Sequence, residues 1–77
     1  MNKCNLVDLP NNQKAIILGI KIENISIKKR LIELGLVKNQ PILMIKNNKW
    51  SKTLTIGVKG YVLALDYVVS SLIEVVF

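Results

Sequence analysis

RLIELGLVKNQPI, residues 30–42, decides the fold of this chain because it contains a helix end, a turn and the start of a strand. Gly35 stands where a helix needs a left-handed residue after its last turn, and Leu36 follows in position to fold back on that turn. Asn39 is expected to have a positive φ in the turn, because asparagine tolerates that conformation. Pro41 suits the first position of a strand, where no ladder hydrogen bond is lost.

A helix is expected to run into this stop, with Ser26 as its predicted N-cap. Ile27, Leu31 and Leu34 recur at i, i+4 and i+7, which places them on one helix face. We expect that face to close the protein core.

The other side of this helix is a candidate contact surface. Lys28, Lys29 and Arg30 fall in its predicted first turn, where cations oppose the helix dipole, and an anionic partner would offset that cost. The alternative is that these flexible side chains simply extend into water. Ile32 lies off the leucine face and is expected to be exposed.

Short strands surround the helix. The apolar and alternating patterns predict strands at residues 14–22, 41–48, 52–59, 61–65 and 72–77, and one helical turn at 66–71. Gly60 separates the third strand from the fourth, and an apolar turn is expected near Leu6 and Leu9. Rolling five short strands into a small barrel removes the free edges and makes one core. The expected fold is therefore mainly β with one or two short helices.

The loop NNKWS, residues 47–51, is predicted to join two strands of this barrel as a hairpin. It places Trp50, with Lys49 beside it, at a polar tip. A large apolar side chain of this kind either folds back over the barrel end or anchors a partner within a polar rim. Both readings stay open from the sequence.

The composition limits the class of protein. A chain of 77 residues makes a single domain, 1–77, and a chain this short buries only about 60% of the surface that its unfolded form exposes. Hydrophobic residues make up 51% of the sequence, so we expect a partner to cover some of the apolar surface. Self-association is one way to do so. Cys4 has no disulfide partner, the longest apolar run is far below a membrane span, and no signal sequence opens the chain. We expect a soluble cytoplasmic protein.

The sequence lacks the residues and motifs that enzymes commonly use for catalysis. Histidine is absent, one cysteine cannot build a metal cluster, the five acidic residues are scattered, and no phosphate-binding loop is present. We therefore expect a protein that is not an enzyme and has no cofactor or metal site of its own. The net charge of +6 permits an acidic protein, lipid or nucleic-acid partner, although Arg30 is the single arginine and dedicated phosphate readers use more.

Three segments resemble the FeoA family, ferrous iron transport protein A. They are residues 8–20 (DLPNNQKAIILGI), 28–45 (KKRLIELGLVKNQPILMI) and 54–76 (LTIGVKGYVLALDYVVSSLIEVV), and the most specific pieces are the helix exit and residues 58–65. The chain departs from the family at Asn11 and Asn39, where glycine is common, and in its hairpin loop, which lacks a Gly-Asp-Pro-like stretch.

The resemblance implies a cytoplasmic SH3-like five-stranded barrel with an inserted helix. It also implies a partner, the cytosolic domain of ferrous iron transport protein B, a membrane permease that bears a G-protein domain. On this reading the protein modulates the assembly or nucleotide cycle of the permease. The alternative is a detached SH3-like module related to metal-dependent repressors, or a small basic barrel that binds nucleic acid. No nucleic acid is expected, because the aromatic residues do not share one face.

Overall fold

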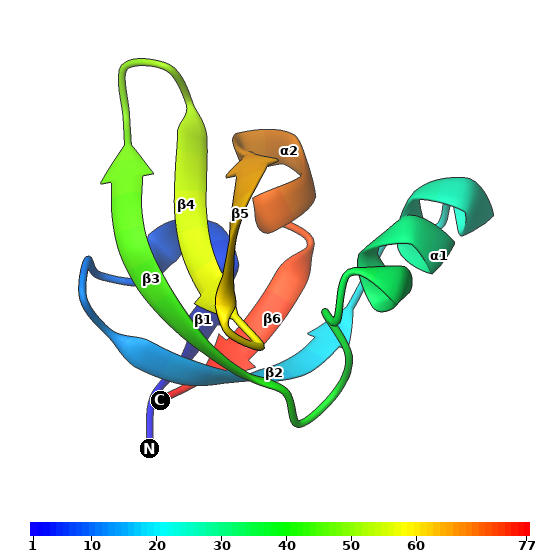
Figure 1. Cartoon of the computed structure of the whole chain (residues 1–77), viewed down its shortest axis with the longest axis horizontal. Helices are drawn as coiled ribbons and strands as arrows, with labels where there is room; N and C mark the ends of the chain where they lie inside the picture. Colours follow the sequence, from blue (N-terminus) through cyan, green and yellow to red (C-terminus); the bar gives the residue numbers. More distant parts are fainter.

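The computed structural model describes residues 1–77, and antiparallel strands are its main regular structure (Figure 1). In chain order the elements are β1 (Lys3–Asn5), the 3-10 turn η1 (Leu6–Asp8), β2 (Lys14–Ile20), α1 (Ile25–Glu33), β3 (Pro41–Asn48), β4 (Thr53–Val58), β5 (Tyr61–Asp66), α2 (Tyr67–Ser70) and β6 (Ile73–Val76). The prediction of a mainly β fold with one or two short helices is confirmed.

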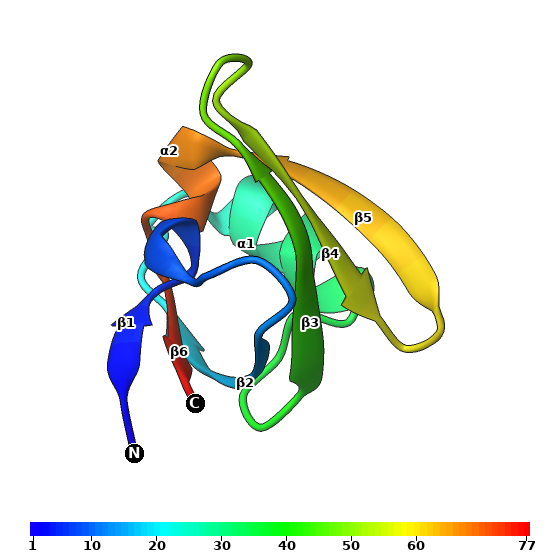
Figure 2. The ribbon, with the colours of Figure 1, turned by 90° about the vertical axis from the view of Figure 1, so that its left-hand side faces the viewer.

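All six strands belong to one sheet, in the order β1-β6-β2-β3-β4-β5. β2 is central to it, because its first residues pair with β3 and its later residues pair with β6. The register shifts between Ile17 and Gly19 in β2 and between Met44 and Lys46 in β3. Such bulges bend a strand and increase its twist, which lets the sheet curl around a core (Figure 2).

The expected barrel of five strands differs from the observed sheet in two respects. A sixth strand, β1, pairs with β6, and the outer strands β1 and β5 do not pair with each other. β1 is three residues long and mostly exposed, so it leaves no alternating apolar pattern in the sequence. The molecule is therefore an open barrel with two free strand edges.

The core is built from the inward positions of the strands. Leu54, Ile56 and Val58 of β4 are buried, whereas Thr53, Thr55 and Gly57 alternate with them on the outer face. The apolar turn expected near the start of the chain is η1, which contributes buried Leu6, followed by buried Leu9. Fifteen buried hydrophobic residues form this single core.

α1 begins earlier than the sequence predicts. Its N-cap is Asn24 rather than Ser26, and the Asn24 side chain accepts a hydrogen bond from the Ile27 N–H at 3.1 Å. Asparagine caps a helix as well as serine does. The earlier start leaves Lys28 at the end of the first turn, moves Lys29 beyond it and places Arg30 in the last turn, where a cation is favourable.

The end of α1 has the predicted stop. Gly35 has φ +96°, its N–H donates to the Ile32 carbonyl at 3.0 Å, and the Leu36 N–H donates to the Leu31 carbonyl at 3.0 Å. These two bonds form a Schellman motif, and the leucines joined by the second bond, Leu31 and Leu36, are both buried. The motif turns the chain sharply from the helix toward β3.

The rest of α1 stands away from the sheet. Leu31 is the only buried residue of the helix, Ile27 is 41% exposed, and Leu34 is half-buried. The expected leucine face therefore closes the core only in part, through Leu31 and the following Leu36. The helix packs through its C-terminal end, and its remaining turns project to one side (Figure 1).

Positive-φ residues make the tight turns. Asn12 has φ 64° and Asn39 has φ 74°, so asparagine holds the left-handed corner in both loops. Lys59 and Gly60 have φ 49° and 81° and form the two-residue turn between β4 and β5. Two consecutive positive φ values define the type I′ turn, whose twist matches that of the strands it joins.

Asn47 of β3 ties together three segments that are distant in sequence. Its side-chain amide donates to the Val7 carbonyl at 2.8 Å, and its amide oxygen accepts a hydrogen bond from the Tyr67 hydroxyl. Its backbone N–H donates to the Asn11 side chain at 2.8 Å. Asn47 thereby joins β3 to η1, α2 and the loop before β2.

Replacing Asn47 with alanine is expected to lower the free energy of unfolding by about 1–3 kcal/mol, because two half-buried polar groups lose their partners. Urea denaturation measures this loss. Tyr67→Phe is the control, since it removes only one of the two side-chain bonds and should cost less. Equal midpoints for Asn47→Ala and the wild type would show that the three segments do not depend on this side chain.

A lysine-flanked groove as the candidate docking site

A groove of about 790 Å³ crosses the underside of the sheet in the orientation of Figure 1. We call it the sheet groove. Its lining is mostly apolar and consists of Met1, Lys14, Ala15, Ile16, Pro41, Ile42, Leu43, Gly57, Val58, Lys59, Gly60, Tyr61, Val62, Val76 and Phe77. No Asp or Glu side chain lines it.

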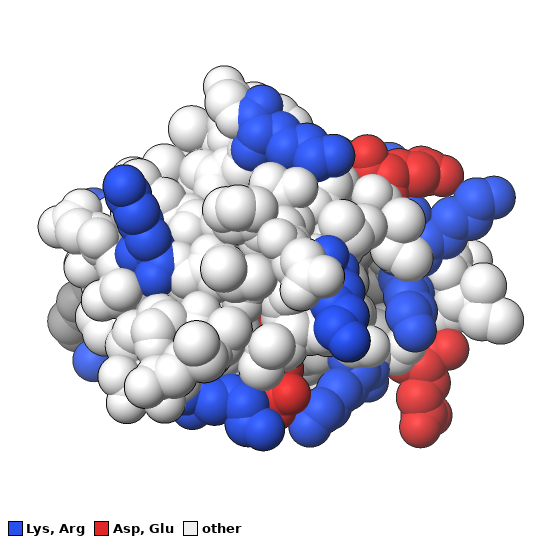
Figure 3. Space-filling view, turned by 90° about the horizontal axis from the view of Figure 1, so that it is seen from below, with Lys and Arg blue, Asp and Glu red and all other residues white.

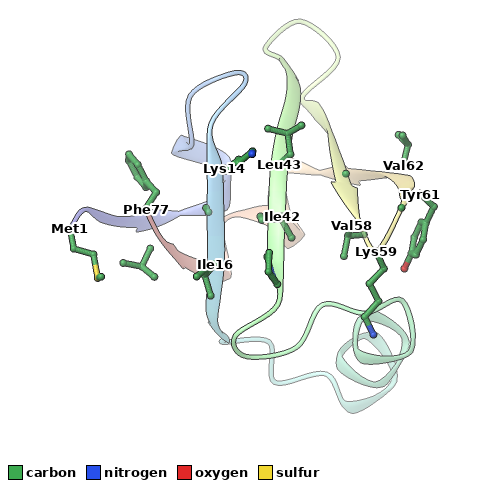
Figure 4. Close-up of a pocket in the computed structure, with 15 residues that line it drawn as sticks. Met1, Lys14, Ile16, Ile42, Leu43, Val58, Lys59, Tyr61, Val62 and Phe77 are labelled. Carbon is green, nitrogen blue, oxygen red and sulfur yellow. The ribbon is translucent and has the colours of Figure 1, made fainter.

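The alternation of the strands carries these side chains to the outer face. Ile16 of β2, Leu43 of β3 and Gly57 of β4 lie at outward positions next to buried core residues. Tyr61 and Val62 of β5 form one end of the groove, and Val62 is 63% exposed. Figure 4 shows Phe77 and Met1 at the opposite end. The groove thus runs across strands rather than along one of them.

Gly57 leaves room on the floor of the sheet groove. A Cβ atom at this position would lie 3.6 Å from Ile45 Cδ1 and 3.9 Å from Leu43 Cβ, which are ordinary contacts. Its backbone is not left-handed, so a larger residue is compatible with the strand. A side chain added here would occupy the groove without opposing the fold.

Lys14 and Lys59 are the only charged side chains among the lining residues. In the space-filling view from below, uncharged atoms fill a broad central area, and the charged side chains around it are mostly Lys and Arg with a few Asp and Glu (Figure 3). The single salt bridge of the molecule, Lys21 to Glu74 at 3.6 Å, involves neither groove lysine. The groove therefore combines an apolar floor with two lysines that form no salt bridge.

The groove also contacts the end of α1. A Cβ atom on Gly35 would lie 3.2 Å from Lys59 Cδ and 3.5 Å from the Tyr61 hydroxyl oxygen. The absence of a side chain at Gly35 thus lets Lys59 and Tyr61 pack close to the helix stop. This contact joins the best-predicted segment of the sequence to the candidate site.

A smaller hollow of about 330 Å³ lies between α1 and β2, and we call it the helix hollow. It is lined by Leu18, Gly19, Ile20, Lys28, Ile32, Leu36, Val37 and Lys38. Two of the helix residues proposed from the sequence, Lys28 and Ile32, therefore border the same hollow. Lys29 and Arg30 are exposed but do not line it.

Trp50 extends into solvent at the tip of the β3–β4 hairpin and is 95% exposed. The Asn48 side chain accepts hydrogen bonds from the backbone N–H groups of Trp50 and Ser51 at 3.0 and 3.2 Å, which shapes the turn. Trp50 does not fold back over the barrel end. Lys49 beside it is also exposed.

The structure does not bring the sequence-derived candidates into one site. The hairpin tip with Trp50 and the helix α1 lie at separate parts of the molecule (Figures 1 and 2). Sequence reasoning missed the sheet groove, which lies on neither of them. Two features of the sequence could have indicated it: apolar residues at strand positions expected to face outward, such as Ile16 between Ala15 and Ile17, and the high overall hydrophobic content.

Other reactive chemistry is sparse. No three His, Cys, Asp or Glu side chains gather where they could share a metal ion. Partial burial and, to a smaller extent, the Asp8 carboxylate raise the pKa of the Cys4 thiol, which reduces its thiolate fraction at neutral pH. No helix is both long and apolar enough to cross a membrane.

The fold places the chain among SH3-like domains. The FeoA of Stenotrophomonas maltophilia, solved with zinc and described as a prokaryotic SH3 domain protein, superposes with a TM-score of 0.81 at 25% identity, over 94% of this chain and 88% of that one. A FeoA-like protein from Clostridium acetobutylicum gives 0.83 at 18% identity, over 99% and 87%. A manganese-dependent transcriptional repressor gives 0.90 at 10% identity, over 99% of this chain but 37% of the repressor.

The family model of the FeoA domain matches residues 4–76. The chain therefore belongs to the FeoA family, as the sequence motifs predicted. No protein with a curated function matches it. The repressor likeness is one of fold.

Proposed function

We propose that this chain is a non-enzymatic accessory protein of ferrous iron transport. It docks on the cytosolic part of the membrane permease, ferrous iron transport protein B, and modulates the assembly or nucleotide cycle of that permease. It works in the cytoplasm and reaches the inner face of the membrane through this partner.

Family membership supports the link to iron transport, and the S. maltophilia relative is itself described as a candidate activating factor for ferrous iron transport. The observation that carries the docking role is the sheet groove, because a soluble domain of this size rarely leaves so large an apolar hollow without a partner. The helix hollow with Lys28 and Ile32 is a second candidate contact surface.

The test is a biolayer interferometry titration of the full chain against the permease's cytosolic domain, without nucleotide and with GDP or a GTP analogue. We expect the wild type to bind and Gly57→Leu, which fills the groove, to bind at least about tenfold more weakly, a loss of about 1.4 kcal/mol. Failure of the wild type to bind in all nucleotide states would contradict the docking role.

Two further variants locate the interface. The double variant Lys29→Glu/Ile32→Glu tests the helix, and Trp50→Ala tests the hairpin tip. A loss seen only with Trp50→Ala would keep the adapter role but place its interface away from the groove. Circular dichroism and a thermal melt of each variant establish that it remains folded.

The repressor likeness and the basic charge define a second candidate, nucleic-acid binding. Titrating the same chain with a generic oligonucleotide distinguishes nucleic-acid binding from docking on the permease. Binding that falls steeply between low and physiological salt would favour this candidate, because phosphate contacts release counterions.

A further inference from the structure

We infer that the sheet groove binds an acidic amphipathic helix of its partner. The inference rests on the docking role proposed above and specifies what the partner presents to this chain. Three features of the groove carry it: its charge, the pairing of the strands beneath it, and its length.

The charge selects an acidic occupant. Lys14 and Lys59 line the groove with no acidic side chain beside them, so carboxylates on an occupant would be attracted on both sides. The same charge disfavours a second copy of this chain. α1 is the longer of the two helices and exposes three isoleucines, but it carries Lys28, Lys29 and Arg30 against a single carboxylate, Glu33.

The strand pairing selects a helix. β2, β3 and β4 lie inside the sheet with a neighbouring strand on each side, so the floor of the groove offers a bound peptide no free strand edge, and only β5 at one end of the groove has one. An extended peptide buried on this apolar floor would leave its own backbone groups without partners, which is costly. A helix satisfies its backbone internally and presents only apolar side chains to the groove.

The width of the sheet sets the length of the helix. The groove reaches from Phe77, just after β6, to Tyr61 at the start of β5, and the strands between them are β2, β3 and β4. Neighbouring strands lie about 4.8 Å apart, so the four gaps span at most about 19 Å. A helix of about 13 residues covers that distance at 1.5 Å per residue.

The experiment is an NMR titration of the isotope-labelled full chain with a designed 13-residue helical peptide, with leucines at i, i+3, i+4 and i+7 and glutamates on its flanks. We expect amide shifts at Leu43, Gly57 and Val62. The emission of Trp50 should stay unchanged, since it lies at the distant hairpin tip. The peptide should gain helical circular dichroism on binding.

Three comparison peptides test the chemistry. They are a scrambled sequence of the same composition, a version with lysine in place of glutamate, and a proline-rich extended peptide. The inference requires the acidic helix to bind at least about tenfold more tightly than each of them. Absence of groove shifts with the acidic helix, equal binding of the scrambled or lysine peptide, or preference for the proline-rich peptide would overturn it.

Matched variants test the place of binding. Gly57→Leu fills the groove, and Thr55→Leu adds a similar side chain to the outer face of the same strand outside the lining. Lys14→Glu reverses a groove charge, and Lys46→Glu reverses an exposed charge on β3 outside the lining. We expect about tenfold weaker binding in the first member of each pair and little change in the second.

These results are separable from the docking role. If the permease domain binds and the acidic helix does not, the docking role stands and the inference about the helix is wrong. If the acidic helix binds the groove and the permease domain does not, the groove chemistry is supported and the proposed permease partner is wrong.

Discussion

Replacing Leu36 with alanine is expected to lower the free energy of unfolding by about 2–5 kcal/mol, the range measured when a large buried side chain is truncated. Leu36 is fully buried, and its N–H donates the hydrogen bond of the helix stop that spans more residues, to the Leu31 carbonyl. The substitution removes core contacts and leaves a cavity beneath the segment that joins α1 to β3. For a small domain this is a large share of the whole stability.

Urea denaturation followed by circular dichroism measures this loss. Leu34→Ala is the matched control, because it removes the same side chain from a half-buried position two residues earlier. We expect the loss at Leu34 to be less than half that at Leu36. Equal losses at the two positions would contradict the burial on which the account of this segment depends.

Replacing Gly35 with alanine is the second large effect. The residue has φ +96°, a conformation that costs a residue with a Cβ about 1–2 kcal/mol. The new Cβ would also lie 3.2 Å from Lys59 Cδ, so the lysine stem has to move. We expect the melting temperature to fall by about 4–8 °C for each kcal/mol lost.

Gly19→Ala is the control for this change. Gly19 lies in β2 without a positive φ, and a Cβ there meets nothing within 4 Å. Alanine at that position should be neutral or slightly stabilising, because it restricts the unfolded chain. A melting temperature that falls equally in both variants would show that the left-handed stop does not set the stability of the helix exit.

The sequence predicted the parts of the fold that depend on local chemistry. The segment 30–42 has the predicted stop, left-handed turn and strand start, since glycine and asparagine tolerate a left-handed backbone and proline fixes φ. β3 has the predicted bounds, and the single helical turn is α2, capped by the Asp66 side chain. Such signals act within a few residues and need no knowledge of the tertiary structure.

Features that depend on distant segments were not predictable in this way. β1 exists because it pairs with β6 at the other end of the chain, and Asn47 acquires its role only when η1 and α2 pack near β3. The leucine face of α1 was overestimated, because periodicity shows which residues share a face but not how much of that face a neighbour covers.

The candidate site shows the same limit. Sequence reasoning selected charged and aromatic residues on α1 and the hairpin tip, since these residue types stand out individually. The sheet groove is made instead of ordinary residues, such as Ile16, Leu43 and Gly57, which come together only when five strands lie side by side. Lys59 was missed for the same reason, although it adjoins the predicted stop at Gly35.

The most direct test of the central claim is an NMR titration of the labelled full chain with the permease's cytosolic domain, comparing the wild type with Gly57→Leu. The account predicts that the amides of Leu43, Gly57 and Val62 shift or broaden in the wild type as the complex forms. In Gly57→Leu the remaining groove amides should stay near their free positions at the same concentrations. Shifts confined to the Trp50 hairpin, or no shifts at all, would contradict docking through the sheet groove.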